Sequence, residues 1–271
     1  MAVSSTFASS DGNAYEFQMG RWSRRLAPRF VKFAGIGHAD RVLDVGCGTG
    51  SLSFCLAQSK SIGAVHGIDL SSAYIEHARR QSHEGSISFQ VADACALPFP
   101  DASFDHTLSM LAIQFVPQVD LALSEMRRVT RPGGTIAAAT WDTRGGFVAI
   151  RMIFDTAAIV DPNGNEVRGR FYTRPMSRPG DLMGAFRDAG FTEIVEDSLT
   201  IRMEFSSFED FWTPHETREG PVAEYVSTLS PGIRHKLRGA VELAYLDGDP
   251  DGPRSYAATA WVVKGRALST P

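Results

Sequence analysis

A short apolar run followed by three closely spaced glycines constrains the fold of this chain most strongly. Residues 41–46 read Arg-Val-Leu-Asp-Val-Gly, which predicts a short buried strand. Gly46, Gly48 and Gly50 follow at intervals of two, and a helical pattern comes next. Glycines permit a tight turn and let backbone N–H groups at the start of a helix approach a ligand closely. The segment therefore predicts a strand, a ligand-binding turn and a helix.

The residues between Asp40 and Asp142 repeat this alternation of strand and helix patterns. Four further strands are predicted at residues 64–69, 87–91, 104–110 and 135–140. Val119 to Val129 predicts a helix with one apolar face, and Pro132-Gly133-Gly134 is expected to end it before the next strand. Strands that alternate with helices are typical of a parallel sheet covered by helices. The fold class expected is α/β, with a doubly wound, mostly parallel sheet.

The pattern changes after residue 180. A helix is predicted from Gly180 to Ala189, with Gly190 suited to a left-handed cap. Apolar and polar residues then alternate from Leu199 to Phe205, as in an antiparallel strand with one solvated face. Residues 256–263 could pair beside that strand. The segment that starts at Ser207 resembles a capping box, and helices are expected at 221–229 and from Pro231 to about Leu246.

These patterns are consistent with one domain, residues 1–271, that carries helical insertions. The ligand-binding core is predicted at 40–142. Residues 180–205 and 254–265 are expected to add the last helix and the antiparallel strands. Residues 1–39 form a predicted N-terminal helical lid, and residues 143–179 and 206–253 form predicted lid insertions on the substrate side.

Composition and charge argue against several classes of protein. The chain has 27 Lys and Arg and 31 Asp and Glu, so its formal charge of −4 supplies no general field to hold a phosphate backbone. We expect no nucleic-acid partner. The longest stretch without a charged residue, Val45 to Ser59, is too short and too polar to cross a bilayer, so no stable membrane insertion is expected.

The first ten residues and the cysteines bear on the compartment. Residues 1–10 hold no Lys or Arg and no apolar core of a secretory signal, which makes the cytoplasm the expected location. Cys47, Cys55 and Cys95 form neither an even set nor a CxxC pair, so we predict reduced thiols and no metal site. The number of subunits is left open.

Acidic residues gather at the predicted carboxyl edge of the sheet. Asp69 ends the second strand, 23 residues after Gly46, where a carboxylate can accept hydrogen bonds from both hydroxyls of a ribose. An alternative is that Asp69 caps the next helix. Asp93 ends the third strand and could accept from an exocyclic amine, or act only as a turn former. A dinucleotide-binding fingerprint would place its third glycine where Ser51 stands, which weakens a nicotinamide-dependent oxidoreductase as an interpretation.

With these residues in view, the sequence resembles the class I S-adenosylmethionine-dependent methyltransferases, in particular the group that includes ubiquinone and menaquinone biosynthesis methyltransferases. The segments that carry the resemblance are 42–50, 67–71, 92–94, 97–105 and 127–134. The resemblance implies a seven-stranded sheet in the order 3-2-1-4-5-7-6 with strand 7 antiparallel. It also implies S-adenosyl-L-methionine as the cofactor.

The resemblance further implies roles for individual residues in cofactor binding. Gly46, Gly48 and Gly50 would pack against the methionine part, and Asp44 would orient its ammonium group. Asp69, with Leu70 in the same motif, would hold the ribose, and Asp93 with Ala94 would meet the adenine. Leu111 would touch the cofactor after the fourth strand, and Arg21 belongs to an N-terminal segment that would close one wall of the site.

A catalytic constellation need not be visible in such a sequence. Methyl transfer from a sulfonium requires alignment and exclusion of water, and a base only when the acceptor must lose a proton. Candidate catalytic or orienting residues are Gln114, Tyr172 and His215, with Tyr15, His106 and Trp212 considered beside them. Gln114 could equally be a surface residue of its loop, Trp212 a core residue and His106 a satisfied strand histidine.

The acceptor is predicted only by class. No Asn/Asp-Pro-Pro-Tyr/Phe tetrapeptide follows the fourth strand, which favours oxygen or carbon over nitrogen or sulfur as the methyl acceptor. The insertions are rich in Phe, Met, Trp and Tyr, so we expect a small and fairly apolar metabolite. The alternative is a protein that keeps the S-adenosylmethionine fold for binding or for another reaction.

Overall fold

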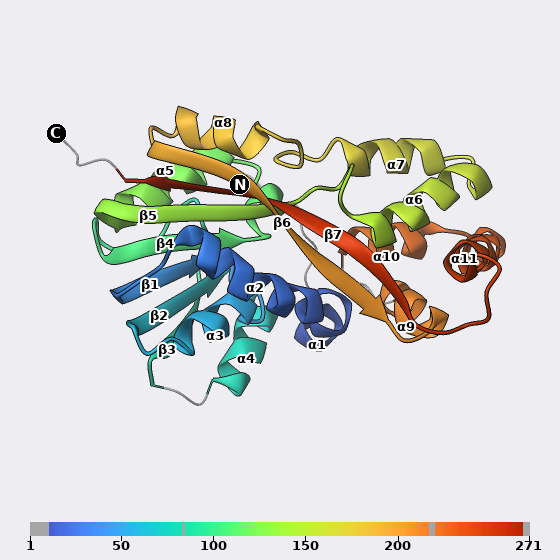
Figure 1. The fold of residues 1–271 in the computed structure, drawn as a ribbon, viewed down its shortest axis with the longest axis horizontal. Coiled ribbons are helices and arrows are strands. Elements are labelled where there is room, and N and C mark those ends of the chain that lie inside the picture. Colours follow the sequence, from blue (N-terminus) through green and yellow to red (C-terminus); the bar gives the residue numbers. More distant parts are fainter. Residues whose placement is uncertain (1–10, 83–84, 217–219, 268–271) are drawn as a thin grey trace.

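A seven-stranded sheet forms the centre of the structure (Figure 1). The structure is a computed structural model and describes residues 11–82, 85–216 and 220–267. The strands are β1 Ala39–Val45, β2 Ile62–Asp69, β3 Ile87–Val91, β4 Phe104–Met110, β5 Thr130–Trp141, β6 Thr192–Phe205 and β7 Arg254–Arg266. Their order is β3-β2-β1-β4-β5-β7-β6, and β7 runs antiparallel to both of its neighbours. The predicted fold class, strand order and antiparallel strand are confirmed.

Helices cover both faces of the sheet. They are α1 Gly12–Tyr15, α2 Arg21–Ala34, α3 Ser51–Ala57, α4 Ser72–Gln81, α5 Val119–Val129, α6 Val148–Val160, α7 Gly164–Tyr172, α8 Asp181–Asp188, α9 Phe208–Trp212, α10 Gly220–Thr228 and α11 Pro231–Leu246. Apolar side chains of α2 and α3 pack with Val42 of β1 on one face. Those of α5 and α8 pack with Leu43 and Val45 on the other. The side chains of β1 therefore alternate between two buried faces, as a strand in a doubly wound sheet requires.

The last two strands extend beyond the rest of the sheet. Residues 260–266 of β7 pair with β5 as well as with β6, whereas residues 254–259 pair with β6 alone among the strands. Figure 1 shows this two-stranded extension leading to α9, on the side of the molecule where α6, α7, α10 and α11 gather. The predicted lid insertions thus form a helical cap at one end of the sheet.

Two strands, β5 and β6, begin at least five residues earlier than the sequence predicts. β5 begins at Thr130, directly after α5, because Thr130 pairs with Phe104 and a register shift accommodates the segment before Thr135. Gly133 has a φ of 76° in this segment, so the predicted turn is an irregularity within the strand. β6 begins at Thr192. The sequence does not reveal this start, because β6 lies at the edge of the sheet and acidic residues in its first half replace the alternating apolar pattern.

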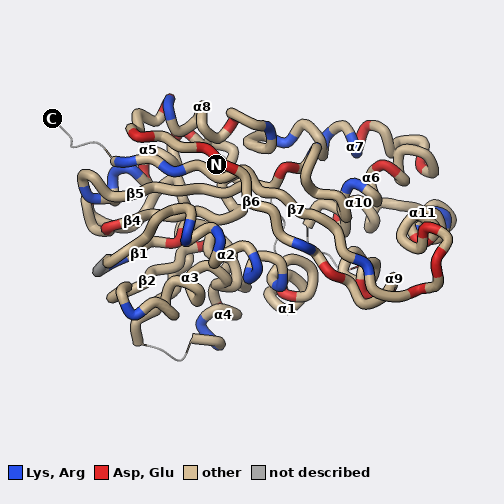
Figure 2. Tube along the Cα trace, in the orientation of Figure 1, with Lys and Arg blue, Asp and Glu red and all other residues tan. Residues whose placement is uncertain are grey.

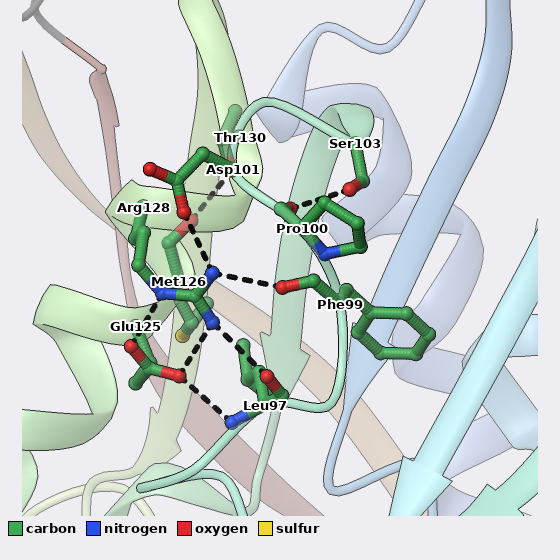
Figure 3. A network of polar contacts seen from close by, with 9 residues as sticks. All are labelled: Leu97, Phe99, Pro100, Asp101, Ser103, Glu125, Met126, Arg128 and Thr130. Carbon is green, nitrogen blue, oxygen red and sulfur yellow. Dashed lines mark hydrogen bonds and ion pairs between the residues drawn. The ribbon is translucent and has the colours of Figure 1, made fainter.

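Arg128 on α5 holds the segment between β3 and β4 in place (Figure 3). Its guanidinium donates to the carbonyl oxygens of Leu97 and Phe99 and to the carboxylates of Asp101 and Glu125, over distances of 2.7–3.0 Å. Glu125 also accepts from the backbone N–H of Leu97 at 2.8 Å. These bonds fasten a segment without regular secondary structure to α5.

The distribution of charge and the helix lengths bear on the expected partners. Figure 2 shows acidic and basic residues interspersed along the trace. Among the described residues, no helix combines the length and the apolar character needed to cross a membrane. The absence of a nucleic-acid partner stays a prediction.

Candidate functional site

The glycine turn after β1 has the geometry that the sequence predicts. The backbone N–H groups of Gly46 and Cys47 both donate to the carbonyl oxygen of Ile68, at 2.8 Å, which ties the turn to the end of β2. Gly46 has a φ of 71°, and a Cβ atom there would stand 2.3 Å from that of Ala112. Only glycine fits this position without movement of the neighbouring loop.

Asp69 lies at the end of β2 with its carboxylate held in a fixed orientation. One carboxylate oxygen accepts from the backbone N–H of Gly48 and the other from that of Ser71, each at 2.9 Å. Ser71, whose side chain accepts from the N–H of Tyr74, is the cap of α4. Each carboxylate oxygen can accept a second hydrogen bond. Because Ser71 caps the helix, the remaining lone pairs of Asp69 can accept hydrogen bonds from a ligand.

A cleft lies over the carboxyl ends of β1, β2 and β3. Its walls are Tyr15, Gly46, Gly48, Ile68, Asp69, Leu70, Ser71, Tyr74, Ala92, Asp93, Ala94, Met110, Leu111, Ala112, Phe115 and Val116. Seven of the ten residues predicted to bind the cofactor are in this set, since only Arg21, Asp44 and Gly50 are not. One oxygen of Asp93 accepts from the N–H of Cys95 at 2.9 Å, and the thiol of Cys95 also interacts with this carboxylate.

Asp44, in β1, and Gly50, the N-cap of α3, do not line the cleft. Gly50 has a φ of 96° and begins α3. Asp44 is buried and accepts a hydrogen bond of 2.7 Å from the hydroxyl of Ser53. Its other oxygen is buried without a partner in the described part of the chain. Burial raises the pKa of Asp44 to about 7, although the bond from Ser53 opposes the shift.

The raised pKa of Asp44 predicts a pH-dependent stability. Between about pH 4 and pH 7 the carboxyl stays protonated in the folded chain and is ionised in the unfolded one. The free energy of unfolding should therefore fall as pH rises through this window, by at most about 1.4 kcal/mol per pH unit. Urea unfolding of the wild type and of Asp44→Asn, at several pH values, measures the effect. A difference between the two proteins that stays constant with pH would contradict it.

An enclosed apolar chamber adjoins the cleft. Its walls are Tyr15, Gln18, Met19, Arg21, Trp22, Leu111, Gln114, Phe115, Trp141, Thr143, Phe147, Ile150, Phe171, Arg174, Met203, Phe205, Phe211, Pro214, His215, Gly220, Pro221 and Val222. These residues come from all three predicted lid segments, from β5 and β6, and from the segment after β4. Tyr15, Leu111 and Phe115 line both spaces, so the chamber and the cleft share one partition.

Leu111 in this partition has an unusual backbone. Its φ is 64°, in the left-handed region that non-glycine residues seldom adopt. A hydrogen bond of 2.8 Å from its N–H to the carbonyl oxygen of Ala139 secures it beside β5. Strained backbone of this kind clusters at functional sites. Leu111 lines both the cleft and the chamber, and its contact with a cofactor stays a prediction.

The structure brings two of the three candidate catalytic residues into the chamber. Gln114 and His215 line it. Tyr172 does not, because its hydroxyl is turned to Asp155, at 2.6 Å, on α6. Arg21, predicted to bind the cofactor, lines the chamber and pairs with Asp210 at 2.7 Å.

The buried histidine of the chamber is a weak base. Burial lowers the pKa of His215 to about 3, so its imidazole is neutral at pH 7. Its Nδ1 atom is buried with no partner among the described residues, and so is the hydroxyl of Thr143. Gln114 accepts from the backbone N–H of Trp141 at 3.2 Å and is thereby oriented. The chamber offers neutral hydrogen-bonding groups.

Of the three residues considered beside these candidates, Tyr15 lines both the cleft and the chamber, whereas Trp212 and His106 have structural surroundings. Trp212 is fully buried, and its indole N–H donates to Glu216 at 2.8 Å. His106 accepts from the backbone N–H of Thr135 at 3.1 Å. Neither residue lines the cleft or the chamber.

Sequence reasoning missed several walls of the site. Phe115 follows Gln114 in a short turn that could have been included with Leu111. Tyr74 lies on α4 and packs on Tyr15, with ring centroids 4.9 Å apart. Arg174 follows α7, in a segment with no recognisable motif.

Comparisons with known proteins agree with this geometry. Residues 43–138 match a family described as a methyltransferase domain. A malonyl-[acyl-carrier protein] O-methyltransferase from Halorhodospira halophila is 39% identical over 244 residues, which cover 85% of this chain and 74% of that protein. A demethylmenaquinone methyltransferase from Symbiobacterium thermophilum is 32% identical over 198 residues, which cover 65% of this chain and 76% of that protein.

Other matches are shorter or concern the fold alone. With several curated relatives the chain shares only 44–45% of their length. The Haemonchus contortus phosphoethanolamine N-methyltransferase 2, solved with phosphomonomethylethanolamine and S-adenosylhomocysteine, superposes with a TM-score of 0.58 at 18% identity. That superposition covers 95% of this chain and 57% of the solved one, and it supports the sheet and its helices.

Proposed function

Because the chain belongs to the class I S-adenosylmethionine-dependent methyltransferases, we propose that it methylates an oxygen or carbon atom of a small, fairly apolar metabolite. The observation that carries this proposal is the shared partition between the polar cleft and the apolar chamber. A methyl donor in the cleft would meet an acceptor in the chamber at the residues of this partition, Tyr15, Leu111 and Phe115.

The groups that line the cleft fit S-adenosyl-L-methionine. The fixed carboxylate of Asp69 has lone pairs left for two ribose hydroxyls. The carboxylate of Asp93, which lines the cleft, suits the exocyclic amine of adenine. Beneath the turn, the buried and unpartnered oxygen of Asp44 suits an ammonium group, directly or through water. When bound, the cofactor supplies a methyl group already activated by a sulfonium.

The chamber would position the acceptor and keep water out. Most of its walls are apolar, and Trp22, Phe205 and Phe211 are almost completely buried. Gln114, Thr143 and His215 add neutral polar atoms that can orient an acceptor. In-line displacement depends mainly on such alignment and dryness. That one relative is named for demethylmenaquinone, an apolar quinone, supports an apolar acceptor.

Calorimetric titration with S-adenosylmethionine, S-adenosylhomocysteine and NAD tests the cofactor. We expect micromolar binding of both adenosyl compounds and none of NAD, because Ser51 stands where a dinucleotide fingerprint has its third glycine. No binding of either adenosyl compound would overturn the proposal. Binding without formation of S-adenosylhomocysteine, across a panel of phenols, quinones and acids, would indicate the non-methylating alternative.

A further inference from the structure

One charged group in the chamber has no counter-ion. The guanidinium of Arg174 lies over the rings of Phe115 and Phe171, at 5.3 and 5.7 Å from their centroids. Within the described residues it makes no hydrogen bond and no ion pair. Burial lowers the pKa of Arg174, although an arginine remains charged at pH 7. Glu224 on α10 acts on it electrostatically from beyond the distance of an ion pair.

The second arginine of the chamber shows the usual arrangement. Arg21 lies over the ring of Trp22, with 4.4 Å between its guanidinium carbon and the ring centroid. It also donates to the carboxylate of Asp210 at 2.7 Å. Buried charges are paired as a rule, because an unpaired one loses its hydration without compensation. Of these two cations, Arg174 is the one without a carboxylate partner in the described part of the chain, and its side chain is partly exposed, since it also lines an open hollow that it shares with Glu224.

The segment that carries Arg174 is fastened to the core. The hydroxyl of Ser177 donates to the carbonyl oxygen of Arg174 at 2.7 Å, and Ser177 is buried. The carbonyl oxygen of Met176 accepts from the buried hydroxyl of Thr140 on β5, at 2.5 Å. The guanidinium therefore extends from an anchored turn into a preformed space, which reduces the entropy lost on binding.

We propose that Arg174 binds a carboxylate of the substrate, and that the substrate is accordingly an apolar carboxylic acid. A guanidinium offers a planar pair of donors that matches a carboxylate. One monoanion balances its single charge, and the aromatic and aliphatic walls accept the rest of such a molecule. This inference rests on the proposed function, since it takes the chamber as the acceptor site.

Calorimetric titration of carboxylic acids into the protein saturated with S-adenosylhomocysteine tests the inference. The probes are two acids, octanoate and 4-phenylbutyrate, each compared with its alcohol and its methyl ester by calorimetry. We expect each acid to bind wild type at least about tenfold more tightly than its neutral counterparts. Arg174→Gln should weaken acid binding about 10- to 100-fold and leave the affinity for the alcohols unchanged. Arg174→Lys should weaken acid binding by a smaller factor. Arg187→Gln, an exposed arginine on α8, is the control for net charge.

The controls separate this inference from the proposed function. Arg174 does not line the cofactor cleft, so Arg174→Gln should bind S-adenosylhomocysteine with wild-type affinity, which also shows that it is folded. If the wild type binds the nucleoside but shows no preference for either acid, the inference is wrong and the proposed function stands. If Arg174→Gln binds the acids as tightly as wild type does, the inference is also wrong and the proposed function also stands. Failure of the wild type to bind the nucleoside would instead overturn the proposed function.

Discussion

Replacing Asp69 with alanine is expected to weaken the binding of S-adenosylhomocysteine by at least about 100-fold. Two charge-assisted hydrogen bonds to the ribose would be lost, and each contributes about 1.5–3 kcal/mol. The substitution also releases the N–H groups of Gly48 and Ser71, which the carboxylate holds at 2.9 Å. Both the ligand contact and the shape of the glycine turn depend on this side chain. Calorimetric titration gives the affinity directly.

Two variants make the result specific. Asp69→Asn keeps the size of the side chain, but its amide group would point an N–H at the N–H of Gly48 or Ser71, so it should bind poorly as well. Asp188→Ala removes an exposed carboxylate from α8 and should bind like wild type. Equal affinity of wild type and Asp69→Ala would remove Asp69 as the ribose ligand.

Replacing Phe211 with alanine should destabilise the protein by about 3–5 kcal/mol, as is typical for loss of a buried aromatic side chain. Phe211 is fully buried in a cluster of rings under the extension of β6 and β7. Its ring lies 5.1 Å from that of Phe205 and 5.4 Å from that of Tyr245, measured between centroids. The cavity left behind would be walled by rigid strand and helix residues that cannot close it. Urea unfolding followed by circular dichroism measures the change.

Leu243→Ala on α11 is the matched control for that measurement. Leu243 is 74% exposed, so its truncation should change the free energy of unfolding by no more than about 0.5 kcal/mol. Similar losses for Phe211→Ala and Leu243→Ala would show that the ring cluster does not stabilise this end of the protein.

The parts of the fold that could be predicted are those whose cause is local in sequence. A buried strand between two helical layers is rich in apolar residues, and the turn at Gly46 requires a positive φ, so both leave a signal in neighbouring residues. The first half of β6 leaves none, because an edge strand with both faces partly solvated needs no regular apolar pattern. Its position is decided by pairing with β7, far away in the chain.

The cofactor residues could be predicted for a similar reason. Asp69 ends β2 and Asp93 closely follows β3, and parallel strands bring their carboxyl ends to one edge. The walls of the chamber follow no such rule. Tyr172 and Arg174 are two residues apart, yet the first turns to Asp155 and the second enters the chamber. That difference depends on where α7 ends and on the hydrogen bond between Thr140 and Met176, which no sequence pattern reveals.

The two-stranded extension of β6 and β7 is expected to open locally at a lower free energy than the central part of the sheet. Residues 254–259 of β7 have a strand partner on one side, whereas residues 260–266 have partners on both. A two-stranded ribbon is marginal by itself, and cooperative units with fewer long-range partners open at a lower free energy than the central sheet. The wall of the chamber formed by Met203 and Phe205 belongs to this ribbon. We therefore expect the backbone amides of this ribbon to exchange with solvent faster than those of the strands that line the cleft.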